Sequence, residues 1–164
     1  MAYRNKTYVA FDGDNDMWAY AYMKGWKQND SSSFNFYDAH DLNTARDSST
    51  EESIKRQLRE RMNNSKVFVL LIGEHTKYLT KFVKWEVEQA LKKDLPIICV
   101  NLNKSREKDN LCPSWLIGEL AIFIPYGAKI MQYALENWPT WHNQYKREGK
   151  SGGYKFNNSV YDEL

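Results

Sequence analysis

A glutamate at the edge of a predicted helix is the strongest candidate for chemistry in this sequence. The helix is predicted over residues 78–92, and at about 100° per residue one of its faces is apolar. That face consists of Val83, Val87, Ala90 and Leu91. Glu86 falls at its margin, whereas Glu88 points to solvent. A carboxylate at such a margin can be partly desolvated and held by neighbours. The alternative is a surface glutamate paired with Lys84 or Lys93.

An acidic loop after the first predicted strand invites a metal-binding interpretation. A calcium loop of the EF-hand type that starts at Asp12 needs Gly at its sixth position and Glu at its twelfth. Met17 and Met23 occupy those positions, so the pattern fails. Asp12 and Asp14 also resemble the signature of haloacid dehalogenase phosphatases, but Asp16 stands where that family has Thr or Val. Metal-dependent phosphotransfer is therefore the last-ranked hypothesis.

Other motifs for cofactors are incomplete. The segment 149–151 reads Gly-Lys-Ser, but a phosphate-binding loop also needs Gly at position 144, where Gln144 stands. Cys99 and Cys112 are too few and too far apart for a zinc site, and the three histidines show no ligand spacing with them. We expect two reduced structural thiols, no metal and no prosthetic group.

Strands and helices alternate along the chain. Apolar or β-rich runs predict strands at residues 7–11, 34–37, 67–73, 96–100 and 122–125. Helices are predicted at 16–28, after the serines at 48 and 49 (each three residues before a glutamate, a capping-box spacing), at 78–92 and at 128–137. This alternation predicts an α/β fold with three α-β-α layers and a mostly parallel five-stranded sheet. Ligands of such sheets bind beyond the carboxyl ends of the strands, so the loops that start at Asp12, Asp38, Gly73 and Asn101 are the ones to search.

Bulk composition narrows the function. At 164 residues the chain fits one domain. We expect an α/β domain over 1–137 and an extension over 138–164, which is turn-rich and is expected to pack on the domain or attach loosely. The net charge of +2 is spread along the sequence, which argues against nucleic acid. No signal peptide or membrane span is apparent, so a cytoplasmic location is expected.

The segment around Glu86 resembles a known family. Residues 82–87 read Phe-Val-Lys-Trp-Glu-Val, and Ala90 and Leu91 follow, which is similar to the third-helix motif of TIR domains, with Phe82 where the family usually has Trp. Further segments fall in family order, at residues 8–12, 36–41, 65–73 and 95–98. The chain looks most like the TIR-like ThsB proteins of the bacterial Thoeris anti-phage system, over about residues 6–101, with the flavodoxin-like TIR fold.

This resemblance implies an enzyme that uses NAD as its substrate. Glu86 matches the glutamate that catalytic TIR domains need to cleave the bond between nicotinamide and ribose. In the ThsB branch the product would be a cyclic or rearranged ADP-ribose messenger that activates a separate effector protein. The alternative is a non-catalytic TIR-like scaffold that self-associates and contacts other proteins.

Seven further residues are expected to bind substrate. Phe11 and Asp12 could bound the nicotinamide ribose, and Phe82 or Trp85 could pack against the cleft. Trp85 should face away from the core of its helix, so a partner surface is an equal alternative for it.

The other three lie on the long loop after the second predicted strand, which matches the BB loop of TIR domains in position. They are Asp38, His40 and Arg46. Arg46 could pair with the diphosphate through its guanidinium fork, or brace the loop through Asp41 or Asp47. His40 could bind substrate or cap backbone groups.

Overall fold

The computed structural model describes residues 6–28 and 50–164 of the chain. Its strands are β1 (Thr7–Ala10), β2 (Val67–Ile72), β3 (Ile97–Asn101), β4 (Ala121–Pro125) and β5 (Gly153–Lys155). Its helices are α1 (Met17–Gln28), α2 (Glu51–Asn63), α3 (Val83–Lys92), α4 (Ala128–Arg147) and α5 (Asn158–Asp162), with short 3₁₀ turns at Thr76–Tyr78 and Ser114–Leu116.

The five strands form one sheet in the order β1-β2-β3-β4-β5, and every pair is parallel. The predicted parallel α/β sheet is confirmed, and four of its predicted strands correspond to β1 to β4. These four are almost completely buried, as expected for central strands covered on both faces. The strand predicted at 34–37 lies outside the described residues.

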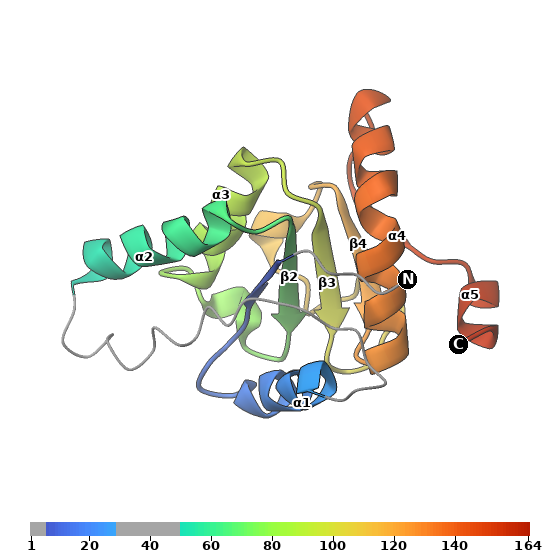
Figure 1. Cartoon of the computed structure of the whole chain (residues 1–164), viewed down its shortest axis with the longest axis horizontal. Coiled ribbons are helices and arrows are strands. Elements are labelled where there is room, and N and C mark those ends of the chain that lie inside the picture. Colours follow the sequence, from blue (N-terminus) through green and yellow to red (C-terminus); the bar gives the residue numbers. More distant parts are fainter. Residues whose placement is uncertain (1–5, 29–49) are drawn as a thin grey trace.

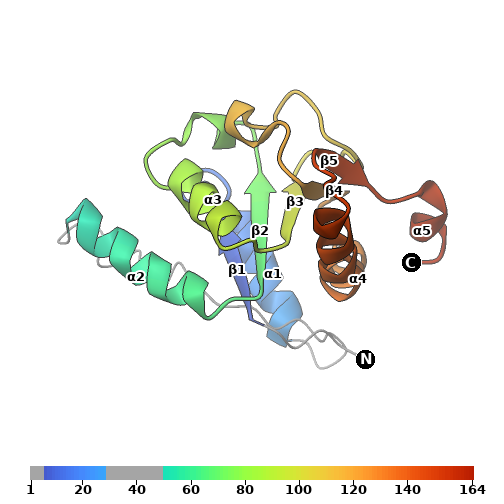
Figure 2. The same cartoon turned by 90° about the horizontal axis from the view of Figure 1, so that it is seen from above.

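Helices cover both faces of the sheet, which gives three layers (Figures 1 and 2). Alternate residues of β1 point to opposite faces. Tyr8 and Ala10 join the apolar cluster under α2 and α3. Val9 joins the cluster under α1 and α4, as does Phe11 just beyond the strand. Each helix thus buries its apolar stripe on a defined side of the sheet.

The start of α2 differs from the capping prediction. Thr50 is its N-cap, and the Thr50 side chain accepts a hydrogen bond from the backbone N–H of Ser53 at 3.1 Å. The prediction from the serines at 48 and 49 was therefore wrong about the capping residue. The hydroxyl oxygen of threonine caps a helix as that of serine does. The spacing to a glutamate therefore did not identify which hydroxyl residue is the N-cap.

The C-terminal segment is more ordered than the sequence suggested. The last long helix was expected to end near residue 137, but α4 continues to Arg147, through Pro139. Trp138 and His142 are buried on it, and β5 then adds to the edge of the sheet beside β4. The continuation of α4 thus packs its apolar side on the sheet, whereas α5 contains no buried residue.

The carboxyl ends of β2 and β3 point to the bottom of Figure 1, the edge at which α1 lies. The loops after β1, β2 and β3 meet at this edge, where parallel α/β sheets bind ligands. Among the helices within residues 6–28 and 50–164, none combines the length and the apolar character needed to cross a membrane.

Replacing Trp138 tests the packing of the C-terminal segment. Its indole is 1% exposed and lies 6.0 Å from the ring of Tyr145 and 6.2 Å from that of Tyr154. Trp138→Ala should lower the free energy of unfolding by about 3–5 kcal/mol, because it leaves a cavity. Urea unfolding measures this loss. The control Trp141→Ala, at a residue 45% exposed, should cost about 1 kcal/mol or less. Equal losses would contradict the packing described.

Candidate functional site

Glu86 is buried at the start of α3. Its side chain is 3% exposed, deeper than the margin position expected from helix geometry. The hydroxyl of Tyr8, on β1, donates a short hydrogen bond to Oε2 of Glu86. This bond joins residues that are 78 positions apart in the sequence. A carboxylate removed from water needs such donors, because an unpaired buried charge is costly.

The surface-pair alternative for Glu86 does not match the structure. Lys84 pairs with Glu88 at 3.9 Å, and Lys93 donates to the side chain of Asn63. Glu88 is exposed, as predicted. Glu86 lies in the first turn of α3, where the N-terminal end of the helix dipole carries partial positive charge. The fold therefore holds one acidic group in a dry, electrostatically favourable place.

A cavity of about 290 Å³ opens between the loop after β1 and the segment that leads into α3. We name it the Phe11–Phe82 cavity after two of its walls; Asp12, Tyr78 and Lys81 also line it. Three of the predicted site residues thus come together here. Glu86 follows Phe82 by one helical turn, and its backbone N–H bonds the Phe82 carbonyl at 2.8 Å.

Asp12 holds the loop together. Its Oδ1 accepts hydrogen bonds from the backbone N–H groups of Asp14, at 3.0 Å, and Asn15, at 3.3 Å. Its Oδ2 accepts from Nδ2 of Asn15 at 2.7 Å. Within residues 6–28 and 50–164, no group of three or more His, Cys, Asp or Glu side chains is placed to hold a metal ion. The loop thus offers no support for metal-dependent phosphotransfer.

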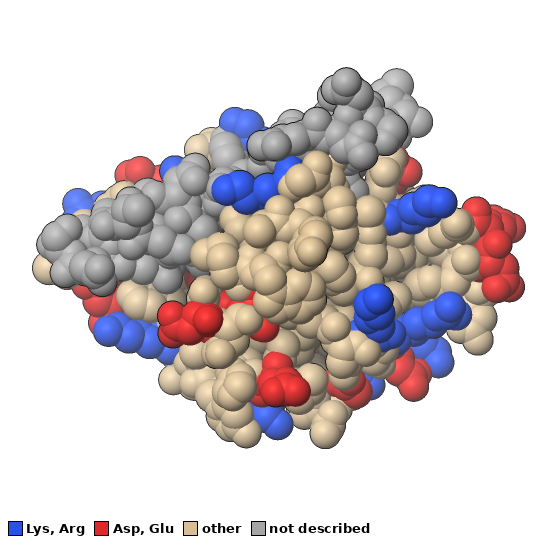
Figure 3. All heavy atoms as spheres, turned by 90° about the horizontal axis from the view of Figure 1, so that it is seen from below, with Lys and Arg blue, Asp and Glu red and all other residues tan. Residues whose placement is uncertain are grey.

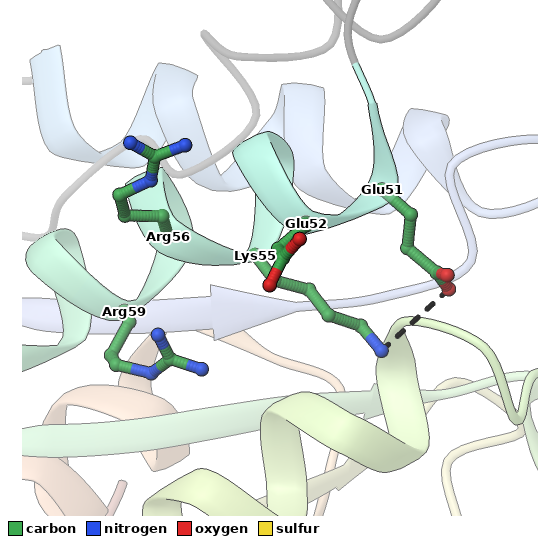
Figure 4. Close-up of a pocket in the computed structure, with 5 residues that line it drawn as sticks. All are labelled: Glu51, Glu52, Lys55, Arg56 and Arg59. Atoms are coloured by element: carbon green, nitrogen blue, oxygen red, sulfur yellow. Dashed lines mark ion pairs between the residues drawn. The ribbon is translucent and has the colours of Figure 1, made fainter.

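Trp85 lies away from the Phe11–Phe82 cavity and faces α2. Its half-buried ring has the Lys55 amine at 5.3 Å and the Arg59 guanidinium at 5.4 Å, both within range of a cation–π contact. A cavity of about 610 Å³ runs along this part of α2 (Figure 4), where Lys55 pairs with Glu51 at 3.6 Å. The ring of Trp85 therefore packs between helices.

Sequence reasoning missed Tyr8 as a site residue. A tyrosine in a buried strand needs a partner for its hydroxyl, and that requirement was the available signal. Asp38, His40 and Arg46 lie outside the described residues. Both cysteines are free and buried, as expected, and burial raises the pKa of the Cys99 thiol well above its usual value.

A second acidic group lies at the same edge of the sheet. Asp16 precedes α1, is 7% exposed and has an Oδ2 atom without a hydrogen-bond partner in the described part of the chain. Burial and then the nearby Asp12 raise its pKa from 3.8 to about 6, with Glu74 adding to the rise and His75 opposing it. The sequence did not predict Asp16 as a site residue; its only notable feature there was the mismatch to a phosphatase motif.

The parallel sheet with helices on both faces is consistent with the TIR-like, flavodoxin-like class of α/β proteins. A family model described as Thoeris protein ThsB, TIR-like domain, matches residues 8–107. The match covers more than half of the chain, from β1 through β3. The chain belongs to the ThsB TIR-like family, which connects it to Thoeris anti-phage defence.

Removing the Tyr8 hydroxyl tests its role toward Glu86. Tyr8→Phe keeps the ring, which stacks on Phe68 with centroids 5.4 Å apart, but removes a donor to a buried carboxylate. The free energy of unfolding in urea should fall by about 1–3 kcal/mol. Tyr22→Phe, at an exposed tyrosine, should leave it unchanged. A Tyr8→Phe protein as stable as the wild type would show that Glu86 does not depend on this bond.

The Asp16 pKa predicts a pH dependence of stability. Because its folded-state pKa of about 6 exceeds the ordinary 3.8, the folded chain binds this proton more tightly than the unfolded chain. The stabilisation is fully present below about pH 4 and is lost as pH rises through about 6, by up to about 3 kcal/mol. Urea unfolding of wild type and Asp16→Asn between these values measures the difference. Parallel pH profiles for the two proteins would refute the assignment.

Proposed function

We propose that this chain is an NAD-processing enzyme that cleaves the bond between nicotinamide and ribose. The buried Glu86 carboxylate, fixed by the Tyr8 hydroxyl one helical turn from the Phe11–Phe82 cavity, carries this proposal. Membership of the ThsB TIR-like family adds to it. Glu86 is the proposed catalytic residue and Tyr8 a positioning residue.

The chemistry fits a single carboxylate. When the C1′–N bond of NAD breaks, its electron pair goes to the pyridinium nitrogen and nicotinamide leaves as a neutral molecule. No general acid is required for that departure. The ribose acquires oxocarbenium character, and a fixed negative charge nearby stabilises it. Glu86 supplies that charge and accepts hydrogen bonds from the ribose hydroxyls.

The nucleophile determines the product. Attack by water forms a C1′–O bond, releases one proton and gives ADP-ribose. Attack by another atom of the same nucleotide gives a cyclic or rearranged ADP-ribose, the kind of product proposed to signal to a separate effector. A closed site that excludes water favours the second outcome.

The cavity walls have distinct proposed roles. Phe11 and Phe82 contribute apolar surface that can pack against the nicotinamide or ribose ring. Asp12 is already bonded to Asp14 and Asn15, so it shapes the wall toward the ribose rather than binding freely. Trp85 faces α2 and is proposed to stabilise the packing of α3 against α2.

Glu86→Gln is the direct functional test. It keeps the shape of the side chain and removes its charge. Nicotinamide release from NAD by the activated protein, followed by chromatography, should fall by about a hundredfold or more. The matched control is Glu88→Gln, because Glu88 is exposed on the same helix and pairs with Lys84; it should retain its activity.

Urea unfolding and circular dichroism establish that the Glu86→Gln protein is folded. Retained nicotinamide release by that folded protein would remove Glu86 from the mechanism. Self-association without nicotinamide release from activated wild-type protein would instead favour the scaffold function.

A further inference from the structure

A separate cavity of about 400 Å³ lies at the carboxyl edge of the sheet. It opens between the start of α1 and the loops that follow β2 and β3. Asp16, Trp18, Glu74, His75 and Asn103 are among its lining residues. Phe11, Phe82 and Glu86 do not line it, so it is distinct from the proposed NAD site. We name it the Asp16 cavity.

The floor of this cavity carries an unsatisfied buried acid. Oδ2 of Asp16 is shielded from solvent and has no hydrogen-bond partner among residues 6–28 and 50–164. Buried carboxylate oxygens are normally bonded, and an unpaired one calls for an explanation. Because its pKa is about 6, Asp16 is mostly ionised near neutral pH. A donor that reaches this carboxylate from the cavity would relieve part of that electrostatic cost.

A glycine makes room for this carboxylate. A Cβ atom added to Gly73, at the end of β2, would lie 2.3 Å from Oδ2 and 2.7 Å from Oδ1 of Asp16. Any other residue would displace the acid from its present place. The packing of Asp16 against Gly73 therefore fixes the carboxylate at the cavity wall.

The charged side chains that line the cavity favour a cationic ligand. Asp16 and Glu74 are its acidic members, and no Lys or Arg occurs among the lining residues of the described chain. His75 is the basic side chain among the described lining residues, and Asp12 lies close enough to Asp16 to raise its pKa. In the part of the chain that the structure describes, no group of three or more His, Cys, Asp or Glu side chains is placed to hold a metal ion.

The remaining walls are aromatic and apolar. Trp18 is nearly half exposed, and Leu102 and Leu111 also line the cavity. Figure 3 looks onto this edge of the molecule and shows a broad uncharged area with both acidic and basic side chains around it. An indole face attracts amines and guanidines that carry apolar stems. A hydrated metal ion would gain nothing from such walls.

We propose that the Asp16 cavity binds a small organic cation, an alkyl amine or alkyl guanidine, with its charged end at Asp16 and its alkyl part beside Trp18. The volume of the cavity falls in the range that small-molecule sites occupy. This site is independent of NAD cleavage. It would be a second ligand-binding site, separated from the Phe11–Phe82 cavity by the loop after β1.

Titration calorimetry with agmatine, which carries both a guanidinium and an ammonium group, tests this proposal. At about pH 8 we expect saturable binding to the wild type, and at least about tenfold weaker binding to Asp16→Asn. Asp14→Asn is the matched control: it removes a carboxylate from the same loop that does not line this cavity, and it should bind agmatine like the wild type. N-butylurea, a neutral isostere of the guanidine end, should not bind.

The pH dependence gives a second readout. Ligand binding favours ionised Asp16, so affinity should fall about tenfold between pH 8 and pH 5, and binding near pH 6 should release protons into the buffer. Glu74 and His75 also face the cavity, so the same titration is made with Glu74→Gln and with His75→Gln; proton release should persist in both and vanish in Asp16→Asn.

Three results would overturn the proposal. They are absence of agmatine binding to the wild type at millimolar concentration, equal binding by Asp16→Asn, and equal binding of N-butylurea. Saturable binding of magnesium chloride that depends on Asp16, without binding of agmatine, would replace the organic cation by a metal. Gly73→Ala tests the packing of Asp16 against residue 73 in a protein that keeps the Asp16 carboxylate. Its affinity for agmatine should be lowered, as in Asp16→Asn.

Discussion

The burial of one carboxylate on α3 is the constraint on which the arrangement of this site depends. Glu86 is 3% exposed, and the Tyr8 hydroxyl donates a hydrogen bond to it in place of water. The bond ties the first strand to the third helix and fixes the distance between them. The Phe11–Phe82 cavity is lined by Phe82 and Val83 from the start of this helix, whereas Tyr8 and Glu86 lie behind its lining.

The parallel sheet explains why two acidic groups of different character occur at one edge. Alternation along β1 directs Tyr8 toward α3 and Phe11 toward α1, so the loop that follows serves both faces of the sheet. On the α3 side, Glu86 is buried and bonded. On the α1 side, Asp16 is buried with an unpaired oxygen. One carboxylate is satisfied within the protein, and the other is suited to a ligand.

Local sequence patterns predicted those features of the fold that depend on neighbouring residues in the sequence. Continuous apolar runs predicted β1 to β4, and helical phase predicted that Glu88 is exposed and that Glu86 lies at the margin of the buried face, where it is in fact fully buried. Features that depend on distant residues were missed, notably Tyr8 as the partner of Glu86. The last long helix was predicted to end near residue 137, yet α4 continues to Arg147, with Trp138 and His142 buried on its continuation. The three-residue strand β5 carries no pattern of its own and exists through its pairing with β4.

The position of the NAD ribose relative to residue 86 tests the central claim most directly. A crystal structure of the Glu86→Gln protein with NAD bound would trap the substrate before cleavage. We expect a hydroxyl of the nicotinamide ribose within hydrogen-bond distance, about 2.7–3.2 Å, of the residue 86 side chain. A ribose bound elsewhere, with residue 86 still enclosed by Tyr8 and out of its reach, would contradict a catalytic role for Glu86.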